Sequence, residues 1–212
     1  MRTDQLIEVL STNVEPVTRR WIDRALIWTV VAGAVGAFCV MLVTVGPRSG
    51  VGGAAELGFL GLKLLFALGI IGPGVAYLMR LMHPGRDARR PFAVLLLPFG
   101  VIALAAVAAM LAGPSATRAS IFGTQWALCL VCIPLFAVLP FAGLVWALRQ
   151  GAPTNLRRTG AIAGLVAGAL GAAAYAFHCP DDSLPFIAIW YGGSIALAGV
   201  IGALLGPKLL RW

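Results

Sequence analysis

Charged side chains are scarce in this chain, and their scarcity argues against a soluble fold. Only 11% of the 212 residues are Asp, Glu, Lys or Arg, whereas about a quarter are charged in an ordinary soluble domain. There are eight acidic residues and two histidines. The sequence also contains no glycine-rich nucleotide loop, no HExxH pattern and no Ser/His/Asp arrangement. These absences argue against the common enzyme classes, and we expect no enzymatic activity and no required cofactor.

Apolar residues make up 60% of the chain and occur in long continuous runs. A helix of about 20 apolar residues crosses the hydrocarbon core of a bilayer, and the runs lack the alternation of a membrane β-barrel. The sequence therefore predicts an all-α fold, a polytopic membrane helix bundle. Its six transmembrane helices are expected at residues 26–45, 57–79, 92–111, 122–148, 161–177 and 185–205. Residues 1–24 then form a short helical head, and residues 25–212 form the transmembrane domain.

The net charge of +8 is distributed unevenly around these six segments. Thirteen basic residues fall before the first segment, after the last one, or in the second and fourth connections; only Arg48 and Arg118 fall in the opposite connections. Positive loops stay in the cytoplasm, so both termini are predicted to be cytoplasmic. The basic residues thus orient the chain in a lipid bilayer, and we expect no direct binding of nucleic acid.

The head has the pattern of an amphipathic helix with a break near Thr12. Its apolar residues recur at helical spacing, which places them on one face; they are Leu6, Ile7, Leu10, Val14 and Val17. Such a helix can lie on the membrane, pack against its own bundle or fill the groove of a partner. The polar face is neutral to acidic, which disfavours the membrane surface.

Two cysteines are expected near the outer side of the membrane. Cys179 lies in a short polar loop with His178, Asp181 and Asp182, and Cys129 lies near the outer end of the fourth segment. If the segments are neighbours, the two cysteines can form a disulfide in an oxidising compartment. Alternatively, they can bind a soft ion such as zinc or cadmium together with His178. The two aspartates are candidate supporting groups or a fourth ligand.

The other two cysteines, Cys39 and Cys132, are interpreted as small apolar side chains that pack in helices. Cys129 and Cys132 have the CxxC spacing, but a redox CxxC needs an exposed helix start that lowers the thiol pKa. This pair falls within an apolar segment. A membrane thiol oxidoreductase is therefore a weak alternative.

A small transporter or channel is the stronger alternative from another functional class. It requires polar or charged residues at mid-membrane, and Lys63 is the only basic residue within a predicted segment. We expect Lys63 to extend toward the outer end, with Glu56 as its partner. Gly160, Gly164 and Gly168 are spaced by four, which predicts close helix packing within the bundle.

The sequence resembles the NrsF-type membrane anti-sigma factors, a six-span family of the proteobacterial inner membrane. The resemblance covers the chain and is stronger in its second half. It is carried by Met1 to Ile7, Pro16-Val17, Trp126 to Leu130, Trp146 to Thr154, Tyr175 to Ser183, Trp190-Tyr191 and Leu209 to Trp212.

This resemblance implies an anti-sigma factor that holds an extracytoplasmic-function sigma factor at the cytoplasmic face of the bacterial inner membrane. It also implies release under heavy-metal or oxidative stress, sensed by two outer cysteines that correspond to Cys129 and Cys179. The head is then the expected sigma-binding part.

Overall fold

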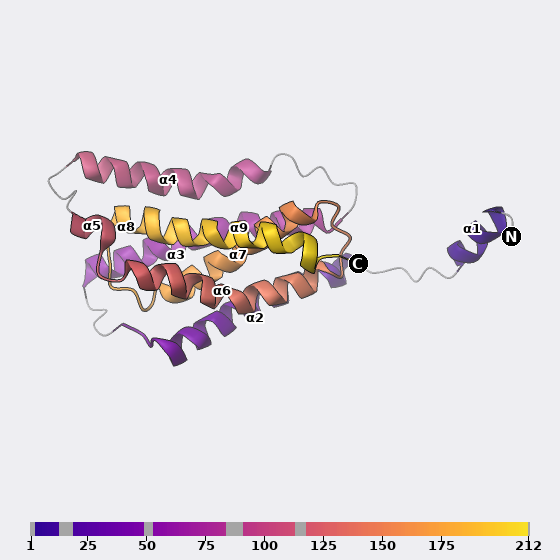
Figure 1. Cartoon of the computed structure of the whole chain (residues 1–212), viewed down its shortest axis with the longest axis horizontal. Coiled ribbons are helices and arrows are strands. Elements are labelled where there is room, and N and C mark those ends of the chain that lie inside the picture. The colour runs from indigo at the N-terminus through magenta and orange to yellow at the C-terminus, as the bar shows by residue number, and fades with distance from the viewer. Residues whose placement is uncertain (1–2, 13–18, 49–52, 84–90, 113–117, 212) are drawn as a thin grey trace.

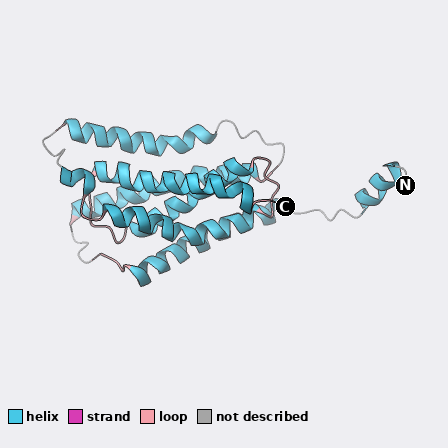
Figure 2. Ribbon diagram, in the orientation of Figure 1, coloured by secondary structure: helices cyan, strands magenta, loops and turns pink. Residues whose placement is uncertain are grey.

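The computed structural model describes residues 3–12, 19–48, 53–83, 91–112 and 118–211. All regular structure in these residues is helical (Figure 2). The helices are α1 (Thr3–Thr12), α2 (Arg19–Thr44), α3 (Ala54–Leu81), α4 (Pro91–Leu111), α5 (Arg118–Phe122), α6 (Trp126–Leu148), α7 (Leu156–Tyr175), α8 (Leu184–Phe186), the π-helix η1 (Ile187–Tyr191) and α9 (Gly192–Leu209). The all-helical prediction is confirmed, and each of the six predicted segments overlaps a helix.

Five helical stretches in the described part of the chain are long and apolar enough to cross a membrane. They are Trp21–Thr44, Ala54–Leu81, Ala93–Leu111, Ser120–Leu148 and Leu184–Leu209. The helix α7 is not among them, because it is built largely from glycine and alanine and carries two arginines in its first turn. These residues contribute little hydropathy.

The helix α7 lies at the centre of the bundle, in contact with α2, α3, α6 and α9 (Figure 1). Most of its residues are buried. A helix that is surrounded by other helices does not need strongly hydrophobic side chains, but its side chains must be small enough for its neighbours to approach closely. Glycine and alanine meet that requirement.

The glycine stripe of α7 packs against a matching stripe of α9. A Cβ atom at Gly160 would overlap the backbone of Gly202, and one at Gly164 would overlap the backbone of Ala198. In the reverse direction, a Cβ at Gly206 would overlap the carbonyl of Leu156. The predicted close packing is therefore confirmed, with α9 as the partner.

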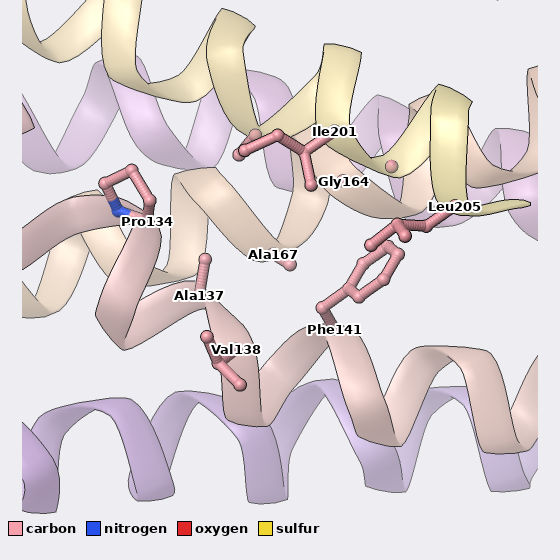
Figure 3. Close-up of a pocket in the computed structure, with 10 residues that line it drawn as sticks. Pro134, Ala137, Val138, Phe141, Gly164, Ala167, Ile201 and Leu205 are labelled. Carbon is pink, nitrogen blue, oxygen red and sulfur yellow. The ribbon is translucent and has the colours of Figure 1, made fainter. Parts of the chain in front are cut away.

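An apolar pocket of about 170 Å³ opens where α6, α7 and α9 diverge (Figure 3). Pro134, Val138 and Phe141 of α6 face Ile201 and Leu205 of α9 across it. Its lining residues carry no charge.

The fourth predicted segment, residues 122–148, lies within the apolar stretch Ser120–Leu148, whose helix is interrupted near its start. Phe122 ends α5, and the membrane-length helix α6 begins at Trp126. The interruption falls at Gly123, whose φ of 56° lies in the left-handed region that favours glycine.

The head helix α1 stands apart from the bundle (Figure 1). It ends at Thr12, as the predicted break required, and α2 is already helical at Arg19. Ile7 is 60% exposed. Val14 and Val17 lie outside the described residues, as do the side-chain placements of Leu6 and Leu10.

Candidate functional site

The structure brings Cys129 and Cys179 together at one end of the bundle. Cys129 lies in the first turn of α6, and Cys179 follows the C-terminal end of α7, where its N–H donates to the carbonyl of Tyr175 at 3.1 Å. Both side chains are fully buried. The thiol of Cys129 is hydrogen-bonded to the sulfur of Cys179, and the two remain separate thiols. Two cysteines fifty positions apart in the sequence are thus neighbours in the structure.

Asp181 attaches the polar loop to the start of α6. Its carboxylate accepts hydrogen bonds from the N–H groups of Thr124 and Gln125 at 2.8–3.0 Å, and from the Thr124 hydroxyl at 2.9 Å. A carboxylate at a helix start satisfies free N–H groups and interacts favourably with the helix dipole. Gly123 leaves space for it, because a Cβ there would lie 2.6 Å from Cγ of Asp181. Asp181 therefore fixes Cys179 relative to the helix that carries Cys129.

Asp182 attaches the same loop to two basic residues. Its Oδ1 lies 2.8 Å from Nζ of Lys63, and its Oδ2 lies 3.1 Å from Nη1 of Arg48. Lys63 is fully buried in α3. Sequence reasoning named Glu56 as the partner of Lys63. In the structure the ammonium group binds Asp182 and the carbonyl of Cys179, because the loop folds back over α3.

His178 faces the connection that follows α2. Its Nδ1 donates to the carbonyl of Gly46 at 2.9 Å, and its ring lies 5.6 Å from that of Tyr175. The backbone N–H of Arg48 donates to the carbonyl of Phe177, which closes the same junction. His178 thus supports the loop that carries Cys179.

The predicted metal ligands are occupied by other partners. Among the described residues, no group of three or more His, Cys, Asp or Glu is placed to hold a metal ion. Asp181 binds the N–H groups of Thr124 and Gln125 just before α6, Asp182 pairs with the two cations, and His178 binds a carbonyl. The two sulfurs face each other, with Tyr175 beside Cys129 and Tyr191 beside Cys179.

Two tyrosines that sequence reasoning missed enclose the thiols. The hydroxyl of Tyr175 donates to Oε1 of Gln125 at 3.3 Å and lies beside Cys129. Tyr191 is fully buried beside Cys179, with its ring 6.0 Å from that of Tyr175. Tyr191 ends the π-helix η1, a distortion often found at functional sites. Tyr175 lies four residues before Cys179, and this helical spacing could have predicted that the two side chains are neighbours.

The surroundings of Cys179 favour its thiolate. The hydrogen bond from the Cys129 thiol holds the pKa of Cys179 below its usual value, and the nearby charge of Lys63 acts in the same direction, whereas burial opposes both. A thiolate is the nucleophilic and metal-binding form of cysteine.

The remaining cysteines lie elsewhere. Cys132 is one turn further along α6 and 7% exposed, and Cys39 is exposed on α2. Neither belongs to the hydrogen-bonded thiol pair.

Comparison with known proteins agrees with the earlier resemblance. A family model described as "Negative regulator of sigma F" matches residues 10–212. The chain is 32% identical over 213 residues to the probable anti-sigma-F factor NrsF of Azospira oryzae, and 31% identical over 215 residues to the anti-sigma-F factor NrsF of Caulobacter vibrioides. Both alignments cover 100% of each chain. No solved structure matches the chain. The chain therefore belongs to the NrsF family of negative regulators of sigma F, whose role is regulatory and not enzymatic.

Proposed function

We propose that this protein is an inner-membrane anti-sigma factor that binds an extracytoplasmic-function sigma factor and releases it when Cys129 and Cys179 react. Membership of the family supports the sigma-factor partner. The hydrogen-bonded pair of buried thiols is the observation that carries the sensing step.

All six long helices cross the membrane in this proposal, with both termini in the cytoplasm. The helix α7 crosses as the central helix, because its neighbours shield it from lipid. The placement of basic residues supports this orientation. The thiols then lie near the outer face, where the periplasm is kept oxidising.

The head is the sigma-binding element of the proposal. The helix α1 stands apart from the bundle, which favours the binding of a partner over packing against its own helices (Figure 1). Leu6, Ile7 and Leu10 on one face provide the anchors that a hydrophobic groove accepts. Val14 and Val17 extend the same apolar pattern in the sequence.

Reaction at the thiol pair is the proposed trigger. Disulfide formation breaks two S–H bonds and forms one S–S bond, while two electrons and two protons pass to an external two-electron oxidant. The alternative trigger is a soft metal ion, which the two thiolates and His178 would hold. To convert a mostly bound population to a mostly free one, either reaction has to supply about 5.5 kcal/mol of differential binding.

Co-purification from detergent tests the binding half. We expect the full chain to retain a sigma factor and a chain lacking residues 1–20 to lose it. Ile7→Asp should weaken retention at least tenfold, whereas Gln5→Asp, a matched change at another exposed position of α1, should leave it unchanged. If no sigma factor accompanies the full chain, the proposed function is wrong and a transporter becomes the better reading.

A reporter of sigma-dependent transcription tests the sensing half. Cys129→Ser and Cys179→Ser should each abolish induction by oxidant or cadmium, and Cys39→Ser is the matched control that should not. Intact-mass measurement after induction separates a disulfide, which removes two hydrogens, from a bound metal ion. Full induction in both serine variants would contradict the sensing step.

A further inference from the structure

Two cations hold the same short segment of the polar loop. Lys63 donates from Nζ to Oδ1 of Asp182 at 2.8 Å and to the carbonyl of Cys179 at 3.1 Å. Arg48 donates from Nη1 to Oδ2 of Asp182 at 3.1 Å and to the same carbonyl at 3.4 Å. Each cation therefore binds one acceptor on the reactive cysteine and one acceptor three residues later, which closes the loop over its own thiol.

Lys63 depends on this arrangement more strongly than Arg48. Its side chain is fully buried, whereas those of Arg48 and Asp182 are 8% and 16% exposed. A lysine within an apolar helix is costly unless it is paired, and Lys63 also lies 5.6 Å from the ring of Tyr191. The buried ammonium group thus has its partners in the loop and in the π-helix, the two elements that enclose Cys179.

We propose that Lys63, on α3, is a positioning residue that holds Cys179 against Cys129. This inference rests on the sensing step of the proposed function. Two neighbouring carboxylates attach the loop to different helices. Asp181 ties the loop to α6, which carries Cys129, and Asp182 ties it to Lys63 on α3. With both ties in place, the two sulfurs have little freedom to separate.

The consequence is measurable as the redox equilibrium of the pair. Restricting two thiols to contact raises their effective concentration and favours the disulfide. Loss of Lys63 removes two charge-assisted hydrogen bonds from the loop, so the disulfide should become easier to reduce. One such bond can be worth tenfold in an equilibrium constant, and a tenfold change makes the potential less negative by about 30 mV.

The experiment uses the full chain in detergent, with Cys39→Ser and Cys132→Ser so that one disulfide is possible. The protein is equilibrated with reduced and oxidised glutathione, and the disulfide fraction gives the equilibrium constant. We expect Lys63→Met to lower that constant about tenfold. Lys208→Met is the matched control, because Lys208 is exposed near the end of α9, and it should leave the constant unchanged.

A double-mutant cycle distinguishes positioning from general loosening. Asp182→Asn should also lower the constant. The double variant should lower it by less than the product of the two single effects, because the Lys63–Asp182 ion pair is common to both substitutions. If Lys63→Met does not fold, the equilibrium constant of Asp182→Asn tests the proposal instead. Two results would overturn the proposal. One is a double variant whose loss in the constant equals the product of the two single losses, and the other is a Lys63→Met constant as unchanged as that of Lys208→Met.

Failure of the inference is distinguishable from failure of the proposed function. If the parent protein forms the disulfide and Lys63→Met forms it at the same potential, the inference alone is wrong. If the parent forms no disulfide at any glutathione ratio, the disulfide trigger is wrong and the inference falls with it. Sigma-factor retention, measured by co-purification, is independent of both results.

Discussion

At the residue scale, the adjacent aspartates Asp181 and Asp182 have the same side chain but bind different partners. Asp181 binds backbone N–H groups at the start of α6, whereas Asp182 binds two side-chain cations. Both had been expected to support a metal ion. In the structure both carboxylates attach the loop to its neighbours, Asp181 to the residues before α6 and Asp182 to Lys63 and Arg48.

Removal of the Asp181 carboxylate should weaken the start of α6. Asp181→Ala loses the acceptor for Thr124 and Gln125, and loss of such a hydrogen bond costs about 1 kcal/mol. We expect the free energy of unfolding in detergent to fall by about that amount. Asp181→Asn retains one acceptor oxygen and should lose less. An unchanged midpoint in Asp181→Ala would contradict the role of Asp181 in attaching the loop.

At the scale of elements, α7 and α9 pack closely against each other along their glycines. Glycines of each helix face backbone atoms of the other, so the axes approach to a distance that larger residues would prevent. In lipid there is little hydrophobic gain from helix association, and close packing of small residues takes its place. This contact explains why the central helix has the composition it has.

A single methyl group at this contact should therefore destabilise the bundle. Gly164→Ala places a Cβ against the backbone of Ala198, and overpacking costs about 1–3 kcal/mol. Gly72→Ala in α3 is the matched control, since a Cβ there meets nothing within 4 Å. It should be neutral, or stabilising by up to about 1 kcal/mol through helix propensity. Thermal unfolding of both variants measures the difference, and equal midpoints would refute the close-packing explanation.

At the scale of the whole molecule, the reactive thiols and the head occupy opposite ends. The polar loop and Cys129 lie at one end of the bundle, and α1 precedes the other end (Figure 1). In the proposed mechanism, a signal at the thiols would reach the head through relative movement of the helices that the loop contacts, namely α3, α6 and α7. The same proposal places the two ends of the bundle in different compartments.

Cysteine labelling in intact cells measures that orientation. In a chain without its four native cysteines, Ala54→Cys lies near the end that carries the polar loop, and Thr154→Cys lies at the opposite end; both positions are exposed. A membrane-impermeant maleimide should label Ala54→Cys directly and Thr154→Cys only after permeabilisation. The reverse pattern would show that the predicted orientation is inverted.

The sequence by itself determined the helical class, the approximate helix positions and the candidacy of Cys129 and Cys179, because hydrophobic runs and a polar loop are local properties. It also indicated the glycine stripe of α7. Tertiary structure alone decided the partners of Lys63, the separate tasks of Asp181 and Asp182, and the enclosure of the thiols by Tyr175 and Tyr191. These contacts join residues that are distant along the chain, and no local pattern specifies which helices become neighbours.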